Sequence, residues 1–383
     1  MNHVSTAAVK RNRLMYLFEA AFEYLISILV TGSFLATLTK ELGVSDSLTG
    51  MLSSIISLGC LFQLVSLSVR TARSKGIVIS FSIINQSLFM LLYGIPLTGL
   101  ERQTKILLFA ILILLAYFVY NVAHPRKISW LMSSVEDGHR GRFTANKEII
   151  SLISGMIFSF GMSTVVDYFS GIGEIRTSFL ISAVVIFVLM VLHSLTMILT
   201  TEKPIPHSPS PNLAHTLNEL VRNKRVLHII VIFVLYYVST YISCPFYSTY
   251  KIGELGLSLK FISAITICGS ISRICVSVFW GKYADRRSFA AMLEKCFVFY
   301  GLAQTCVIFA VPSNGKVIFS LYSILHGIAL GGINSALTNL IFDYVPPEKR
   351  ADSLAVTQSI AGLTGFLATL CISPLVSHIQ NQR

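Results

Sequence analysis

The sequence predicts an all-α protein whose helices cross a lipid bilayer many times, and two observations lead to this prediction. The first is composition: of 383 residues, 54% are hydrophobic and 13% are charged, whereas about a quarter of the residues in a soluble domain are charged. The mean hydropathy is +0.70. The second is the arrangement of the apolar residues in long blocks, many of about 18 residues or more, which is the length that a bilayer-spanning helix needs.

The apolar blocks predict eleven spans. The clearest block, residues 106–122, contains no charged side chain. The predicted spans are residues 14–38, 49–69, 76–99, 105–134, 146–169, 175–199, 226–250, 258–280, 289–311, 316–342 and 352–374. The first block also follows a basic cluster, as a signal peptide would, but it is too long and contains two glutamates, which favours an uncleaved first helix.

Charge distribution predicts the orientation. The net charge is +12, and the basic residues form short clusters between apolar blocks instead of one basic face, which argues against nucleic acid as a partner. The clusters are concentrated in alternate loops, beginning with Lys10, Arg11 and Arg13. By the positive-inside rule this pattern predicts a cytoplasmic N-terminus and an integral protein of the cell membrane. The seven cysteines form no CxxC pair, so we expect small buried apolar residues, with no disulfide and no metal site.

The chain divides into two related halves. Residues 1–200 hold six spans, residues 226–383 hold five, and residues 201–225 form a polar linker whose second part has the pattern of a short amphipathic helix. Residues 135–140 and 345–350 share Val and Arg at their ends and occupy the same topological point in each half, which indicates a duplicated six-helix unit. A twelfth span is absent from the sequence, so we expect the C-terminus on the extracytoplasmic side.

The segment Gly281-Lys-Tyr-Ala-Asp285-Arg286-Arg287 follows the eighth predicted span. Together with six spans, a linker and a second related set, it resembles the cytoplasmic loop signature of the major facilitator superfamily. The resemblance implies alternating access and a cytoplasmic gate in which this loop packs against the start of the fifth span. The expected gate residues are Gly281, Asp285, Arg286, Arg287, Arg140, Arg142 and Arg350.

Three features depart from the family pattern. The loop between spans two and three has no acidic residue, the fifth span lacks the Gly-Pro signature of drug/proton antiporters, and the twelfth span is missing. The first departure puts one side of the gate in doubt, and the second argues against multidrug export.

Ionisable and polar side chains inside the spans are the candidate site, because they are costly in lipid and are usually functional. The resemblance implies that spans one, four, seven and ten line a central cavity, and most of these residues fall on three of those spans. They are Glu19, Glu23, Asn121, His124, Arg126, Lys127, His326 and Asn334. Depth along the helices predicts that Glu23 faces either Arg126 or Lys127.

Structural roles are open for the same residues. Glu19 is near the edge of its span, where water can solvate it. The side chain of Arg126 or Lys127 can extend to the membrane interface. His326 can be a packed histidine with a hydrogen bond. Arg273, a further charge in span eight, belongs either to the site or to the gate.

No nucleophile–base pair, metal-ligand spacing or phosphate loop occurs in the sequence, so we predict no enzyme and no cofactor. The leading hypothesis is a secondary transporter of a small organic solute, with protons as a possible coupling ion. Two alternatives remain: an exporter of amphiphilic compounds, and a transporter-like receptor or scaffold that no longer cycles.

Overall fold

The computed structural model describes residues 6–68, 75–132, 134–135, 140–202, 222–345 and 350–381. Every regular element in these ranges is helical, as the composition predicts. The first half contains α1 (Thr6–Leu29), α2 (Gly32–Glu41), α3 (Asp46–Ser68), α4 (Lys75–Gly94), the 3-10 turn η1 (Ile95–Leu97), α5 (Arg102–Met132), α6 (Arg140–Gly171) and α7 (Ile175–Leu199). The second half contains α9 (Lys224–Gly253), α10 (Leu259–Arg286), α11 (Phe289–Val307), α12 (Gly315–Tyr344) and α13 (Arg350–Asn381).

All eleven predicted spans form helices. Ten of the described spans are long and apolar enough to cross a membrane, with α1 and α2 counted together. The other predicted span is α11, whose hydropathy is lowered by Glu294, Lys295 and Gln304 and which ends at Val307, earlier than the predicted residue 311. At the C-terminus the helix continues through Pro374 to Asn381, beyond the predicted end at residue 374.

The first span is not one continuous helix, contrary to its prediction as residues 14–38. It breaks between Leu29 and Gly32, and Gly32 has φ +54°, a conformation that only glycine adopts without strain. At the break, the Thr31 hydroxyl donates to the carbonyl of Ser27 at 2.7 Å. The break separates α1 from α2 near the middle of the span and changes what faces the interior there.

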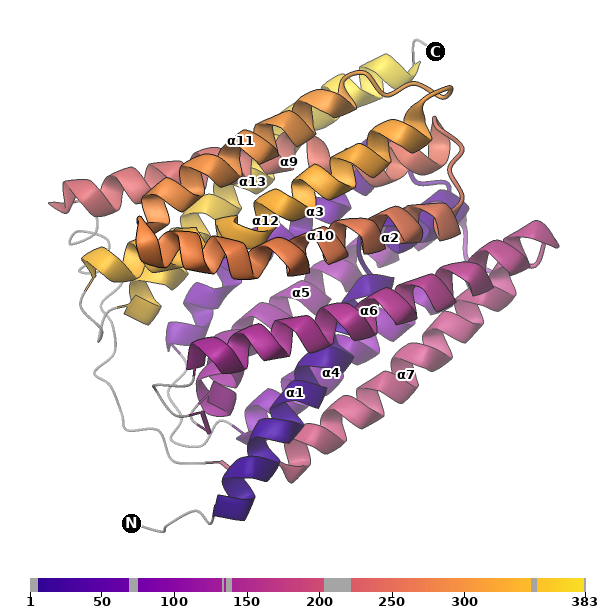
Figure 1. Ribbon diagram of the computed structural model, residues 1–383. Helices are drawn as coiled ribbons and strands as arrows, with labels where there is room; N and C mark the ends of the chain where they lie inside the picture. Colours follow the sequence, from indigo (N-terminus) through magenta and orange to yellow (C-terminus); the bar gives the residue numbers. More distant parts are fainter. Residues whose placement is uncertain are drawn as a thin grey trace.

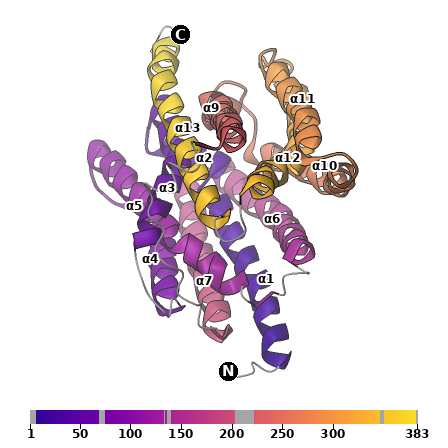
Figure 2. The ribbon, with the colours of Figure 1, turned by 90° about the vertical axis from the view of Figure 1, so that its left-hand side faces the viewer.

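The two halves pack against each other along α3 and α13, and along α6 and α10. Small residues allow the first of these contacts: a Cβ at Gly362 would lie 2.4 Å from the carbonyl oxygen of Ser57, and the Ser57 hydroxyl donates to the Gly362 carbonyl at 2.7 Å. Such close approach through small residues is typical of membrane helices. Figures 1 and 2 show the described ends of the chain at opposite ends of the bundle, as an odd number of crossings requires.

The linker prediction is tested only at its edges. Residues 203–221 lie outside the described part of the chain, and they include most of the predicted amphipathic helix. Asn223 has extended backbone angles, and its side chain accepts hydrogen bonds from the N–H groups of Arg225 and Val226. Asn223 therefore caps α9, and the amphipathic linker helix stays a prediction.

Candidate functional site

A buried cluster of charged groups joins three helices of the first half. Glu19 and Glu23 lie one turn apart on α1 and therefore share a face. The Lys127 ammonium on α5 pairs with both carboxylates, at 2.9 Å from Oε1 of Glu19 and in direct contact with Glu23. The sequence left open which of two neighbouring cations faces Glu23, and in the structure it is Lys127.

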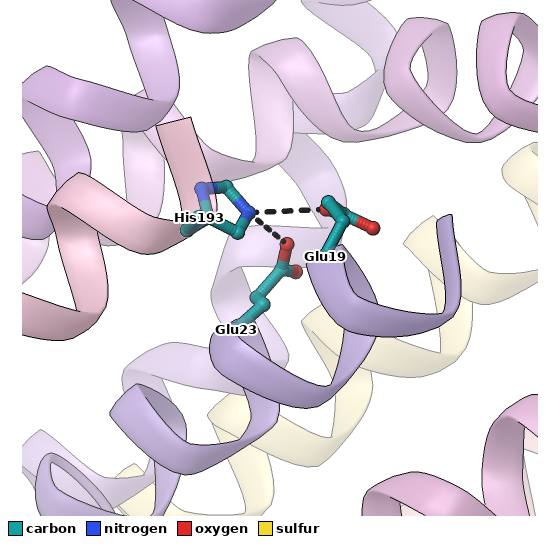
Figure 3. Close-up of side chains that lie close together, drawn as sticks. All are labelled: Glu19, Glu23 and His193. Atoms are coloured by element: carbon teal, nitrogen blue, oxygen red, sulfur yellow. Dashed lines mark hydrogen bonds and ion pairs between the residues drawn. The ribbon is translucent and has the colours of Figure 1, made fainter. Parts of the chain in front are cut away.

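His193 on α7 completes the cluster, as Figure 3 shows together with both glutamates. Its Nε2 lies 3.1 Å from Oε1 of Glu19 and 3.5 Å from Oε2 of Glu23. On the other side of the ring, the Gln86 amide nitrogen on α4 lies 3.0 Å from Nδ1. With the Gln86 amide nitrogen as the donor to Nδ1, the neutral imidazole donates from Nε2 toward Glu19.

Burial makes the charge balance of this cluster important. The side chains of Glu19 and Lys127 are 3% and 5% exposed, His193 is fully buried, and Glu23 is 22% exposed. With neutral His193, the four groups carry two negative charges and one positive charge. Buried charges are tolerated in pairs, so one carboxylate lacks a counter-charge within the cluster, and Glu23 is the one with access to solvent.

The cluster forms part of the wall of a cavity of about 630 Å³ between the two halves. From the first half, α1, α3, α4, α5 and α6 contribute to the wall, and from the second half, Arg273 on α10 and Asn334 on α12. Arg273 forms an ion pair with Glu148 of α6, which also lines the cavity. This ion pair connects the halves across the cavity, so Arg273 belongs to the cavity wall.

Several polar atoms of the cavity wall are buried without a hydrogen-bond partner. Within the described residues these are the Tyr16 hydroxyl, Oε1 of Gln86 and Nδ1 of His124. A buried polar group without a partner costs about 1–3 kcal/mol.

Five of the eight predicted cavity residues line this space: Glu19, Glu23, His124, Lys127 and Asn334. The other three, Asn121, Arg126 and His326, do not line it. Asn121 is 4% exposed and accepts a hydrogen bond from the Gln63 amide on α3 at 3.2 Å, so it joins two helices. His326 stacks on Tyr322 with ring centres 5.0 Å apart, which agrees with its structural alternative. Arg126 is half-buried.

The segment with the gate signature was predicted as a loop after the eighth span, but residues 281–286 form the last turns of α10; its role as a gate stays a prediction. Arg286 is the last residue of α10, Arg287 is its C-cap, and both side chains are exposed. A Cβ at Gly281 would meet nothing within 4 Å, so in this structure Gly281 is not the close-approach residue that was expected. The side chains of Asp285, Arg140, Arg142 and Arg350 lie outside the described residues.

The cluster also has a metal-like donor set, which the sequence did not predict. One ligand atom each from Glu19, Glu23 and His193 lies within 4.8 Å of the others. The Lys127 ammonium contacts both carboxylates and therefore already supplies a cation at this position. The position that a metal ion would take is thus occupied by the Lys127 ammonium.

Sequence reasoning missed His193 and Gln86. Each carried a weak signal, since each is a strongly polar side chain inside an otherwise apolar span. They were missed because α4 and α7 lie outside the set of helices that the resemblance assigned to the cavity. Only the three-dimensional structure shows that they lie beside Glu19.

Comparison with known proteins supports the architecture. The crystal structure of the nucleoside transporter NupG superimposes with a TM-score of 0.69 at 15% sequence identity, covering 98% of this chain and 91% of that one. A bacterial metal transporter gives a TM-score of 0.59 at 13% identity, covering 96% of this chain and 90% of that one. A bacterial homologue of the iron transporter ferroportin, in an outward-facing state with soaked iron, also gives 0.59 at 13% identity, with 95% and 97% covered.

No curated protein sequence matches this chain. The low identities mean that the similar structures establish the fold alone. The family model described as "Major Facilitator Superfamily" matches residues 16–369, which is most of both halves. The chain is therefore an integral membrane protein of the transporter type, and it belongs to the major facilitator superfamily.

Proposed function

We propose that this protein moves a small polar organic solute by alternating access through the central cavity and couples the movement to protons. The observation that carries the proposal is the Lys127 ammonium between Glu19 and Glu23 in the cavity wall. Membrane proteins rarely place three charged groups in one span region without a functional reason.

The polar lining favours a polar solute over an amphiphile. The hydroxyl of Tyr16 can donate a hydrogen bond, Oε1 of Gln86 can accept one, and the imidazole of His124 can do either. When the side chains of the wall move enough to expose these buried atoms, a solute that carries both donors and acceptors can pair with them. An apolar solute leaves them unpaired and loses that free energy.

The charge balance favours a proton as the coupling ion. A proton on Glu23 removes the surplus negative charge of the cluster and releases Lys127 to pair with Glu19 alone. The next cation in the cavity wall is Lys147 on α6, whose ammonium lies over the Tyr16 ring at 5.1 Å from the ring centre. Glu23 thus has the Lys127 ammonium and a proton as alternative partners, which allows exchange as a solute enters.

Contacts between the halves support alternating access. At the end of the bundle away from the N-terminus, the Asp167 carboxylate on α6 accepts hydrogen bonds from the backbone N–H groups of Leu259 and Lys260 at the start of α10, at 3.1 and 2.6 Å. At the same end, Ser47 donates to the carbonyl of Ser373 on α13. With a cytoplasmic N-terminus, as predicted, these contacts close the extracytoplasmic side.

The test uses purified protein in proteoliposomes that contain a pH-sensitive dye. Uridine, glucose and alanine serve as probes, because they are polar, neutral and chemically distinct. We expect at least one probe to raise the thermal stability of the protein by mass action and to drive proton movement into the vesicles.

Glu23→Gln separates coupling from a purely structural role. Coupling predicts that the same probe still stabilises the variant but no longer moves protons. A structural role predicts lower stability with proton movement retained. The matched control is Glu294→Gln, because Glu294 is 72% exposed on α11 and pairs only with its neighbour Lys295. If a probe stabilises the wild type but drives no proton movement into the vesicles, the protein behaves as a receptor and the proposal is contradicted.

A further inference from the structure

A second chamber of about 260 Å³ lies next to the break between α1 and α2. It shares Tyr24, Ser27, Thr31 and Leu152 with the wall of the central cavity, so the two spaces adjoin. Its other walls come from α6, α9 and α10. The side chains that line it are rich in hydroxyl groups: Ser27, Thr31, Ser33, Ser159, Ser248, Ser263, Thr266 and Ser270.

One charged side chain lines this chamber, the ammonium of Lys251 on α9. It lies over the ring of Phe319, 5.6 Å from the ring centre, and Phe319 is fully buried. Within the described part of the chain, no carboxylate lies within 4 Å of Lys251. A partly buried ammonium whose one close contact is an aromatic ring is under-compensated, because such a contact contributes about 0.5–2 kcal/mol.

The start of α2 adds positive potential on the opposite wall. Thr31 is the N-cap of α2, and its side chain does not cap the helix. The first N–H groups of a helix have no acceptor within the helix and carry the positive end of its dipole. Gly32 and Ser33 line the chamber, and a Cβ at Gly32 would lie 4.0 Å from the hydroxyl of Ser248, one turn before Lys251. The ammonium and the helix start therefore belong to the same local environment.

Three hydroxyl groups of the chamber are free to bind a ligand. The other hydroxyls have partners, such as Thr266, which donates to the Ile262 carbonyl at 2.8 Å. Within the described residues, the hydroxyls of Ser33, Ser248 and Ser270 make no hydrogen bond. Each of these can donate to or accept from a ligand hydroxyl.

We propose that this chamber binds a small hydroxylated carboxylic acid of the size and chemistry of a sugar acid, with its carboxylate at Lys251 and the start of α2. The carboxylate supplies the counter-charge that Lys251 lacks, and the ligand hydroxyls pair with the three free serines. This proposal rests on the proposed function, because it names the class of solute and a subsite beside the central cavity.

The test compares two probes that differ in charge. D-Glucuronate carries the carboxylate, and D-glucuronamide is its neutral counterpart of nearly the same shape. Affinities are measured by thermal stabilisation of the purified protein. We expect glucuronate to bind the wild type more tightly than glucuronamide, and Lys251→Gln to weaken glucuronate binding by about 10–100-fold, as expected for one charge-assisted hydrogen bond. Glucuronamide binding should change little.

The matched control is Lys316→Gln. Lys316 is exposed, and its ammonium lies over the Phe261 ring at 5.8 Å from the ring centre, so this variant also removes a lysine–aromatic contact, but outside the chamber. The proposal is overturned if glucuronate and glucuronamide bind the wild type equally, if neither binds, or if both variants weaken binding alike. These outcomes leave the proposed function intact when a neutral solute still moves protons, so the two failures are distinguishable.

Discussion

Removing the ammonium of Lys127 should be strongly destabilising, and restoring charge balance should reverse most of the loss. In Lys127→Met, Glu19 and Glu23 remain side by side, and the partner left to them within the cluster is His193. Glu19 is 3% exposed, so water screens its charge weakly. Breaking a buried ion pair by deleting one partner costs about 3–5 kcal/mol, which lowers the folding equilibrium constant by about 10²–10⁴.

The assay is unfolding of the purified protein, followed by its helical circular dichroism as the denaturing detergent fraction is raised. The triple variant Glu19→Gln, Glu23→Gln, Lys127→Met has no buried charge in the cluster and should recover most of the lost stability, because replacing a whole buried pair is often nearly neutral. The control Lys295→Met removes an exposed pair, in which Lys295 is 53% exposed, and should change the stability by about 0–1 kcal/mol. If Lys127→Met resembles this control, the cluster is not an ion-pair network in the folded protein.

Three further outcomes are expected. Asp167→Asn weakens the carboxylate cap on α10 by about 0.3–1 kcal/mol. The rate at which a cavity cysteine reacts with an extracytoplasmic thiol reagent should then rise by up to about fivefold. An unchanged rate would show that the contact between Asp167 and α10 does not close the extracytoplasmic side. Gly327→Ala places a Cβ 2.1 Å from the backbone oxygen of Gly269 and should lower the unfolding midpoint clearly, whereas Gly161→Ala, with nothing within 4 Å, should not. Asp285→Asn should change cytoplasmic cysteine accessibility more than solute affinity, as the resemblance implies; the reverse result would place Asp285 in the binding site.

The helices were largely predictable, because a bilayer imposes a minimum length on each apolar block. The predicted span 175–199 coincides with α7. The break at Gly32 was not predicted, because a single glycine in an apolar block is common and its positive φ depends on packing between α2 and α9. The cap at Asn223 was likewise not predicted, since the residues around it follow a continuous helical pattern.

The candidate site was predictable only where a residue carries a charge, because a charge inside a membrane span costs free energy. Glu19, Glu23 and Lys127 are charges inside apolar spans, and their pairing followed from depth along the helices. Gln86 has no charge and histidine can be neutral, so these residue types cost less in an apolar span and stand out less. Their contact joins α4 to α7. The spacing of residues along one helix does not reveal which helices are neighbours in the bundle.

The geometry also indicates how a proton in the first half can influence the second. The charged cluster lies entirely on α1, α5 and α7, whereas the proposed alternating access requires the halves to move against each other. Two consecutive residues of α6 bridge this distance: the Lys147 ammonium faces Tyr16 of α1, and Glu148 pairs with Arg273 of α10. When Glu23 gains or loses a proton, the potential at Lys147 changes, and the same helical turn holds the ion pair to the second half. Coupling through α6 needs no long chain of residues, because one turn of this helix contacts both sides of the cavity.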